Sequence, residues 1–105
     1  MAHARVAIFT FKPGMAQEAI DKAEREVLPM FQKQPGFISY TLAGSGGDKA
    51  ISFSLWDSKR QAEEANRVTA EWVQKNLSRI LVSVDRHIGE VAFSFPPIQV
   101  HVPAD

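Results

Sequence analysis

The sequence contains no cysteine, which excludes disulfide bonds, thiolate nucleophiles and cysteine metal sites together. Its formal net charge is zero and it has no basic block, so we expect no nucleic-acid partner. No apolar run approaches the roughly 18–20 residues that cross a bilayer. The amino terminus MAHARVAIFTF lacks the long apolar region and cleavage site of a signal peptide. We therefore expect a cytoplasmic protein that does not bind membranes.

The composition is typical of a folded globular domain, with 105 residues, 45% of them hydrophobic and 23% charged. A chain of this length predicts one domain, which we place at residues 1–95. Residues 96–105 form a proline-rich tail. Within it, residues 98–102 alternate in polarity, which predicts an extra edge strand that contacts a partner subunit.

The first half of the chain predicts a strand, a helix and a second strand. The strand Ala4–Phe11 has two apolar faces and ends at Lys12-Pro13-Gly14. The helix spans Met15–Gln34, with apolar residues at three- and four-residue steps and a kink or early stop at Pro29. The strand Phe37–Ala43 and the glycine-rich loop that follows it, residues 44–48, indicate a hairpin.

The second half predicts a third strand, a further helical region and a last strand. In Ile51–Trp56, aromatic and branched residues alternate with small polar ones, and a capping box at residues 58–61 begins a helix directly afterwards. This helix runs to about Val82, with a break expected near Val68-Thr69 because both residues are β-branched. The last strand is predicted at Asp85–Phe95.

The resulting order is β-α-β-β-α-β, which indicates the α+β class and a ferredoxin-like fold with a four-stranded antiparallel sheet. Two helices cover only one face of such a sheet. The other face would carry Val6, Ile8, Ile51, Phe53 or Leu55, which is too much apolar surface for a small monomer. We therefore predict a homodimer that packs sheet against sheet as a dimeric α+β barrel.

The chain resembles the antibiotic biosynthesis monooxygenase (ABM) domain family of dimeric α+β barrels. The resemblance covers roughly Arg5–Phe95. It is carried by the early strand ending in Phe11-Lys12-Pro13-Gly14, by Pro35-Gly36-Phe37 before the second strand, and by Ser54-Leu55-Trp56-Asp57-Ser58 before an alanine-rich helix. It implies oxidation of phenols or hydroquinones by O₂ without metal, flavin or haem, so we expect no cofactor.

Carried over by position, the resemblance is incomplete. Trp56 matches the family tryptophan that ends the third strand, but Ser52 stands where hydroquinone-oxidising members have asparagine, and Ala62 or Glu63 where they have tyrosine. Haem-degrading members have asparagine, tryptophan and an iron-ligating histidine at the positions that here hold Ala7, Asn66 and Asn76. The resemblance therefore does not imply haem degradation, because no axial ligand is present.

Cofactor-free oxygenation requires a water-excluding pocket and a donor that holds an oxyanion. Ser52, Ser54 and Trp56 share one strand face, which would form a half-polar cavity if the helices cover it. The helix residues facing that cavity would be Asn66, Trp72 and Asn76. In the alternative interpretation these groups merely pack under the helices, and the sequence does not favour either interpretation over the other.

A general base is harder to find. His87 would open the last strand at the cavity mouth, where an imidazole of near-neutral pKa suits proton transfer, although a solvent-facing histidine is the commoner arrangement. Glu90 would need a cation such as Arg5 or Arg86 if it faces the dimer barrel. Tyr40 could supply a phenol, but a cross-strand packing role is favoured. The three scattered histidines do not indicate a metal site.

Our leading hypothesis is a cofactor-independent monooxygenase acting on a phenolic, polyketide-type or quinone-like metabolite, with Trp56 and His87 as catalytic residues. Ser52, Ser54, Asn66, Trp72 and Asn76 would bind the substrate. The alternative is a non-catalytic small-molecule-binding or stress-associated barrel protein, favoured by Ser52 and Ala62 at positions where active members have polar cavity groups.

Overall fold

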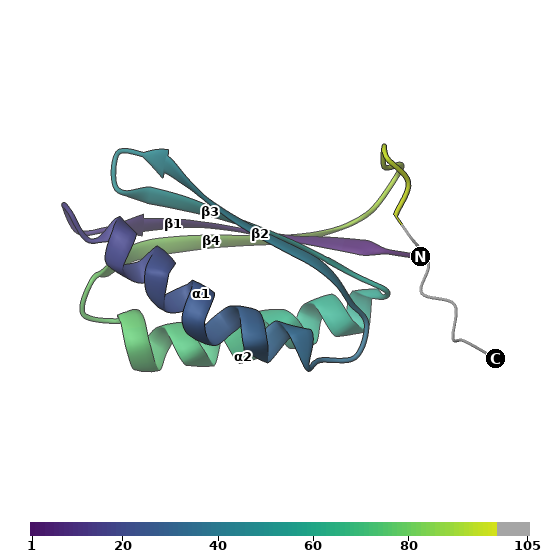
Figure 1. Ribbon diagram of the computed structural model, residues 1–105, viewed down its shortest axis with the longest axis horizontal. Helices are drawn as coiled ribbons and strands as arrows, with labels where there is room; N and C mark the ends of the chain where they lie inside the picture. The colour runs from purple at the N-terminus through teal and green to yellow at the C-terminus, as the bar shows by residue number, and fades with distance from the viewer. Residues whose placement is uncertain (99–105) are drawn as a thin grey trace.

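The computed structural model describes residues 1–98 and has the predicted βαββαβ order (Figure 1). The sheet order is β2-β3-β1-β4, and every neighbouring pair of strands is antiparallel. The ferredoxin-like fold is thus confirmed. The edge strand predicted in the tail falls almost wholly outside the described residues. The elements are β1 (His3–Phe11), α1 (Ala16–Gln32), β2 (Phe37–Gly46), β3 (Lys49–Trp56), α2 (Lys59–Leu77) and β4 (Leu81–Glu90).

Both helices lie on the same side of the sheet, which gives a two-layer molecule with one open sheet face (Figure 1). Alternate residues of β1 point to opposite layers, so that Ala7, Phe9 and Phe11 are buried under the helices. Ile8, from the other face, is 38% exposed. The division of β1 into two apolar faces therefore agrees with the alternation in the sequence.

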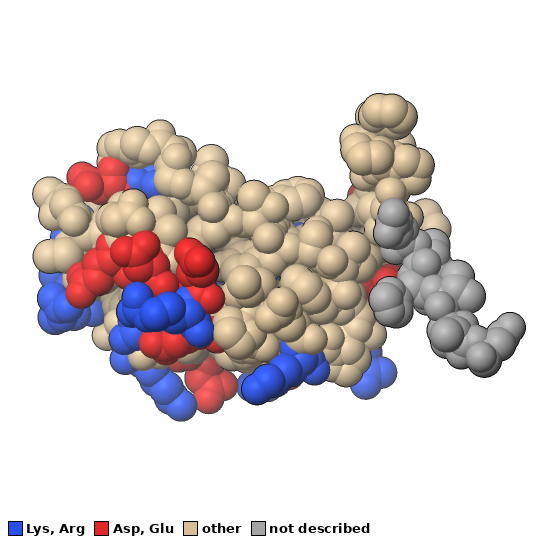
Figure 2. All heavy atoms as spheres, in the orientation of Figure 1, with Lys and Arg blue, Asp and Glu red and all other residues tan. Residues whose placement is uncertain are grey.

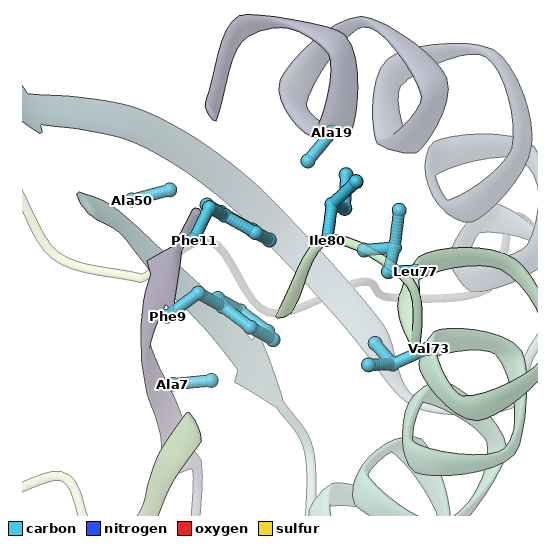
Figure 3. Close-up of a cluster of buried hydrophobic side chains, with 8 residues drawn as sticks. All are labelled: Ala7, Phe9, Phe11, Ala19, Ala50, Val73, Leu77 and Ile80. Atoms are coloured by element: carbon cyan, nitrogen blue, oxygen red, sulfur yellow. The ribbon is translucent and has the colours of Figure 1, made fainter. Parts of the chain in front are cut away.

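One end of the helix–sheet layer is entirely apolar. Phe9 and Phe11 stack with their ring centroids 5.9 Å apart, and they face the carboxyl end of α2 (Figure 3). Burying such side chains supplies most of the free energy that holds the helices against the sheet. The cluster consists of Ala7, Phe9, Phe11, Ala19, Ala50, Val73, Leu77 and Ile80.

Ser58 caps the start of α2 as the predicted capping box requires, and Gln61 reaches back to the Ser58 hydroxyl. The Ser58 hydroxyl accepts a hydrogen bond from the Gln61 backbone N–H at 3.3 Å, and Gln61 Oε1 accepts one from that hydroxyl at 3.1 Å. Gln61 also lies against Gly36, which has φ +80°, and a Cβ there would come within 1.9 Å of Gln61 Oε1. Glycine at position 36 thus lets the turn before β2 approach the start of α2.

Both helices differ from prediction in detail. The helix α1 includes Pro29 and continues to Gln32, so no early stop occurs at the proline. The break predicted near Val68-Thr69 is wrong, because α2 is continuous from Lys59 to Leu77. The Thr69 hydroxyl donates to the Ala65 carbonyl one turn back, and burial of Thr69 against the sheet outweighs the weak helix propensity of a β-branched pair.

The bounds of β2 and β4 also differ from the prediction. The strand β2 extends to Gly46, so Gly47 and Asp48, with φ of 58° and 62°, form a two-residue hairpin turn in place of the longer loop expected. The last strand was predicted at Asp85–Phe95 and lies at Leu81–Glu90. Because α2 ends at Leu77, five residues before Val82, the chain returns to the sheet earlier than predicted.

The open sheet face is apolar and partly exposed. Ile51 is 39% exposed and Phe53 40% exposed on this face. Beyond β4, residues 91–98 leave the sheet on the side away from the helices (Figure 1), and Phe93 and Phe95 there are 88% and 92% exposed. In Figure 2 charged side chains gather toward the helices, whereas the upper edge of the molecule is largely uncharged.

Candidate functional site

A buried arginine lies between the sheet and the helices, at the end of the layer opposite the apolar cluster. Arg5 comes from β1 and is 0% exposed. Its Nε donates to Asn66 Oδ1 on α2 at 2.5 Å, and its Nη1 donates to Ser52 Oγ on β3 at 3.4 Å. Its Nη2 has no hydrogen-bond partner within residues 1–98. A guanidinium carries five N–H donors, so this one retains donor capacity in a site without water contact.

The surroundings of Arg5 are aromatic and uncharged. Its guanidinium carbon lies 5.6 Å from the centroid of the Phe31 ring, a distance at which a cation is attracted to the ring face. Burial lowers the pKa of Arg5 to about 10, because a charge loses hydration in the interior. Burial likewise raises the pKa of Tyr40, while Arg5 and a hydrogen bond with Ser52 lower it. Arg5 therefore remains a cation near pH 7.

A second arginine, Arg86 on β4, belongs to the same face of the sheet. It pairs with Ala7, and Ile88 pairs with Arg5, so the two arginines are diagonal neighbours across β1 and β4. The charge of Arg86 contributes to lowering the pKa of Arg5, and burial lowers the pKa of Arg86 itself. Arg86 Nε is buried and, within residues 1–98, also has no hydrogen-bond partner. Two cations thus border one region, Arg5 fully buried and Arg86 half-buried.

Trp56 ends β3 as predicted, but its indole N–H already donates a hydrogen bond within the protein. Its Nε1–H donates to Ser54 Oγ at 3.0 Å, and both side chains are 0% exposed. The indole packs edge-on against Phe31, with centroids 5.2 Å apart, and against Phe37 at 5.5 Å. In this conformation Trp56 and Ser54 are core residues that hold the end of β3 against the helices. Their catalytic and binding roles stay predictions.

A small cavity of about 30 Å³ lies between the helices and the sheet. Ser52, Tyr40 and Thr69 supply its polar wall, and Ser52 is the residue that links it to Arg5. Trp72 covers it from α2, and the Trp72 Nε1–H donates to Glu26 Oε1 on α1 at 3.0 Å, which ties the two helices together. The remaining lining is apolar, from β1, α1, β2, β3 and α2.

The predicted substrate-binding residues are only partly brought together. Ser52 and Trp72 line the cavity, and Asn66 reaches the same region through Arg5. Asn76 is half-buried, but its Nδ2 donates to the Trp72 carbonyl one turn back on α2 at 2.9 Å. It is thus committed to its own helix and is not a cavity-lining residue.

His87 does not lie at the cavity mouth. Because β4 begins at Leu81, His87 is in the middle of the strand, and it pairs with Val6 on the open face. Its Nε2 lies 3.1 Å from Asp85 Oδ2 on that same face. Trp56 and His87 are therefore on opposite sides of one sheet, and they cannot act on one substrate within a subunit. Glu90, predicted to need Arg5 or Arg86, is exposed and forms no ion pair within the described chain.

Sequence reasoning missed Arg5 and Arg86 as site residues and gave Tyr40 a packing role. One signal was present in the sequence, because Arg5 alternates with Ala7, Phe9 and Phe11 and so belongs to their buried face. A charged residue at an inward strand position is rare without a partner. Across residues 1–98 no three His, Asp or Glu side chains gather as a metal site. No helix in that range has the length and apolarity needed to cross a membrane.

The fold and the site define a ferredoxin-like α+β protein whose helix–sheet interior holds a buried, uncompensated cation beside a small cavity. The family model for antibiotic biosynthesis monooxygenase matches residues 2–72. The chain therefore belongs to the antibiotic biosynthesis monooxygenase family. This confirms the resemblance seen in the sequence. No curated protein matches the chain.

Several solved structures share the fold. A protein of unknown function from Nitrosomonas europaea has a TM-score of 0.71 at 17% identity, with 99% of this chain and 96% of that chain covered. A mutant of SnoaB, a cofactor-independent oxygenase from Streptomyces nogalater, has a TM-score of 0.71 at 15% identity, covering 90% and 97%. The protein Rv0793 from Mycobacterium tuberculosis has a TM-score of 0.71 at 16% identity, covering 90% and 98%.

Proposed function

We propose that the protein is a cofactor-independent monooxygenase that oxidises a phenolic or quinone-like small molecule between its helices and its sheet. Family membership supports the reaction class. The observation that carries the proposal is the Arg5 guanidinium, which is buried, hydrogen-bonded only to the neutral Ser52 and Asn66 side chains within the described chain, and left with a free Nη2. A preorganised cation of this kind stabilises an oxyanion strongly because water is excluded.

In the proposed reaction the substrate loses a proton from its hydroxyl group or from the carbon adjacent to a carbonyl, and the resulting anion binds beside Arg5. The anion then donates electrons to O₂. For a methylene carbon that becomes a carbonyl, one oxygen atom enters the substrate and the other leaves as water with the two hydrogens. The electrons for O₂ reduction come from the substrate, so the balance requires no further reductant.

This arrangement also addresses the missing general base. An adjacent cation lowers the pKa of an acidic group, here the substrate hydroxyl, and so raises the fraction bound as the anion at neutral pH. His87 lies on the open face and is not needed for this step. Tyr40, whose pKa is raised by burial, stays protonated and suits a hydrogen-bond donor to the substrate or to reduced oxygen.

Substrate entry requires the cavity to widen, because about 30 Å³ holds no aromatic ring system. A groove of about 170 Å³ opens on the surface between α1 and β2, lined by Ile20, Glu24, Leu28, Tyr40 and Leu42. Ile20, Tyr40 and Leu42 also line the cavity. We therefore propose that the substrate enters past Tyr40 and Leu42, from the α1–β2 side.

Oxygen uptake by the purified, metal-free protein tests the proposal against a panel of hydroxyanthrones, hydroquinones and flavonols. We expect saturable uptake of one O₂ per substrate oxidised, with no hydrogen peroxide released. Uptake that disappears on adding a chelator, or that releases one peroxide per O₂, would contradict a cofactor-free monooxygenase.

The second candidate function is a non-catalytic small-molecule-binding or stress-associated protein. It is favoured by the Trp56 Nε1–H, which Ser54 already occupies, because a donor so engaged is not free for a substrate. The same panel distinguishes the two functions. A binding protein would be thermally stabilised by a panel member without any oxygen uptake.

We also propose a homodimer through the open sheet face. Members of the family are commonly dimeric. The partly exposed Ile8, Ile51 and Phe53 on this face support the proposal, because a contiguous apolar sheet surface is rarely left in contact with water. The segment after β4 contains the highly exposed Phe93 and Phe95, and a partner subunit would also bury these side chains. The cytoplasmic location and the domain boundary at residue 95 stay predictions.

A further inference from the structure

Arg86 shows a feature that the proposed oxidation does not use. Its Nε is buried and, within residues 1–98, without a hydrogen-bond partner, as is Arg5 Nη2. Across antiparallel strands, diagonal neighbours on one face have Cβ atoms roughly 7 Å apart, and the charge of Arg86 lowers the pKa of Arg5, so both side chains border the same region. A single phenolate oxygen beside Arg5 would leave the Arg86 donor unsatisfied.

No protein carboxylate compensates the two arginines in the described part of the chain. Every ion pair there uses Arg67, Lys75, Arg79 or His87 as its cation. Asp85, next to Arg86 in sequence, points to the open face and contacts His87. Glu90 shares the face of Arg86 but is exposed and unpaired within residues 1–98. Because Arg5 and Arg86 repel each other and have no protein counter-charge within residues 1–98, an anion bound between them would be stabilised by both.

The walls around the two arginines indicate what carries that charge. Phe31 lies under the Arg5 guanidinium, and Phe31 and Tyr40 meet edge-on at a centroid distance of 4.9 Å. Apart from Ser52, Tyr40 and Thr69, the cavity is lined by apolar and aromatic side chains. An inorganic anion would satisfy the donors but leave this aromatic and apolar wall without a partner. An aromatic acid would satisfy both.

We infer that the ligand of this site is an aromatic carboxylate, whose two carboxylate oxygens bind between Arg5 and Arg86 while its ring occupies the widened cavity. The inference rests on the proposed function for the location of the site, and it adds the substrate class. A carboxylate matches two separate N–H donors because it offers two oxygens, each with its own lone pairs. The hydroxyl that is oxidised would then be a ring substituent close enough to Arg5 for the same cation to stabilise its anion, as the proposed function requires.

Binding of two shape-matched compounds tests the inference without any turnover. We would measure, by isothermal titration calorimetry at pH 7, the affinities of 2-naphthoate and 2-naphthamide, which differ in charge but little in shape. We expect naphthoate to bind roughly ten- to a hundredfold more tightly, the range typical of a charge-assisted hydrogen bond in a buried site. Because neither compound is oxidisable here, failure of the monooxygenase proposal leaves this test intact.

Two variants locate the effect. The Arg86→Gln variant should lose about tenfold in naphthoate affinity and keep its naphthamide affinity. The matched control is Arg25→Gln, because Arg25 is exposed on α1 and its replacement changes the net charge equally. Equal affinity of the two compounds, or the same loss in both variants, would overturn the inference. Competition by acetate or phosphate with an affinity equal to that of naphthoate would also overturn it, since it would indicate a simple anion site.

Discussion

The two ends of the helix–sheet layer are built from the same elements but differ in chemistry. At one end, Phe9 and Phe11 meet the carboxyl end of α2 in a cluster without a polar side chain. At the other end, Arg5 and Asn66 lie among Phe31 and Trp56. At both ends the inward-facing side chains recur every two residues along the strands and every 3.6 residues along the helices.

This difference separates stability from function. An apolar cluster is stable without a ligand, since burial of its apolar surface itself contributes favourably to the free energy of folding. A buried guanidinium that is hydrogen-bonded only to neutral groups destabilises the fold, because no carboxylate offsets the free energy lost on desolvating the charge. The polar end is therefore where a ligand has most to add. Three substitutions test this division, and a fourth tests the open face of the sheet.

The largest expected effect is on activity, in the Arg5→Met variant. Removing a cation that holds an oxyanion lowers kcat by about a hundredfold to a thousandfold. Its thermal midpoint should not fall, because an apolar side chain of similar length replaces an uncompensated buried charge. Oxygen uptake and thermal unfolding measured on the same preparation check both halves. Retained oxygen uptake, or a large fall in the midpoint, would place Arg5 with the structural core.

The apolar end should behave in the opposite way. Ile80, just after α2, is 3% exposed, and Ile80→Ala should lower the free energy of unfolding by about 2–5 kcal/mol through lost burial and a cavity. The affinity for substrate or for a naphthoate probe should change little, because Ile80 does not line the cavity and its carbonyl accepts a hydrogen bond from the Lys12 N–H, beyond the end of β1 opposite Arg5. Urea titration gives the stability. A changed affinity in a variant that remains folded would contradict the division.

A third substitution concerns the open sheet face. We expect Phe53→Asp to abolish the proposed dimer, because it puts a charge on the partly exposed apolar face through which the two subunits would pack. Light scattering after gel filtration should then give the monomer mass of 11.7 kDa. The exposed residue Gln74 on α2 provides the control Gln74→Asp, which should remain dimeric. A wild-type protein that is already monomeric would contradict the sheet-face dimer directly.

Most of the fold could be predicted because it depends on local signals. The proline–glycine breaks, the Ser58 capping box and the alternation in β3 each specify one element through contacts close in sequence. The continuity of α2 and the bounds of β4 could not be predicted in this way. Thr69 is held in the helix by burial against the sheet, which is a tertiary effect that its propensity does not report.

The site was predicted less well for a related physical reason. Trp56 and Ser54 have the residue types of a binding site, but they hydrogen-bond each other, and only the structure gives that distance. The misplaced start of β4 put His87 at a strand end, whereas the true register places it on the open face. Arg5 was overlooked because arginine at a strand residue usually indicates a solvent-facing position, and only its alternation with the buried β1 residues indicates otherwise.

The smallest expected effect concerns Tyr40 and the alkaline stability of the polar end. Burial raises the pKa of Tyr40 above its ordinary 10.0, so between those two pH values the unfolded state has lost the proton that the folded state retains. Tyr40 therefore contributes stability that is complete below pH 10 and is lost as the pH rises through its folded pKa. Arg5 acts with the opposite sign, since burial lowers its folded pKa to about 10, below the ordinary value of an arginine, and stability from this group rises as the pH rises above 10. The Tyr40→Phe variant loses the Tyr40 contribution, and it also removes the phenolate charge that raises the pKa of Arg5, so both changes act in the same direction. Its unfolding free energy, measured in urea from pH 8 to pH 11, should decline less steeply than that of the wild type. Parallel curves would show that the Tyr40 phenol has the same pKa in both states and that the polar end is wetter than its burial indicates.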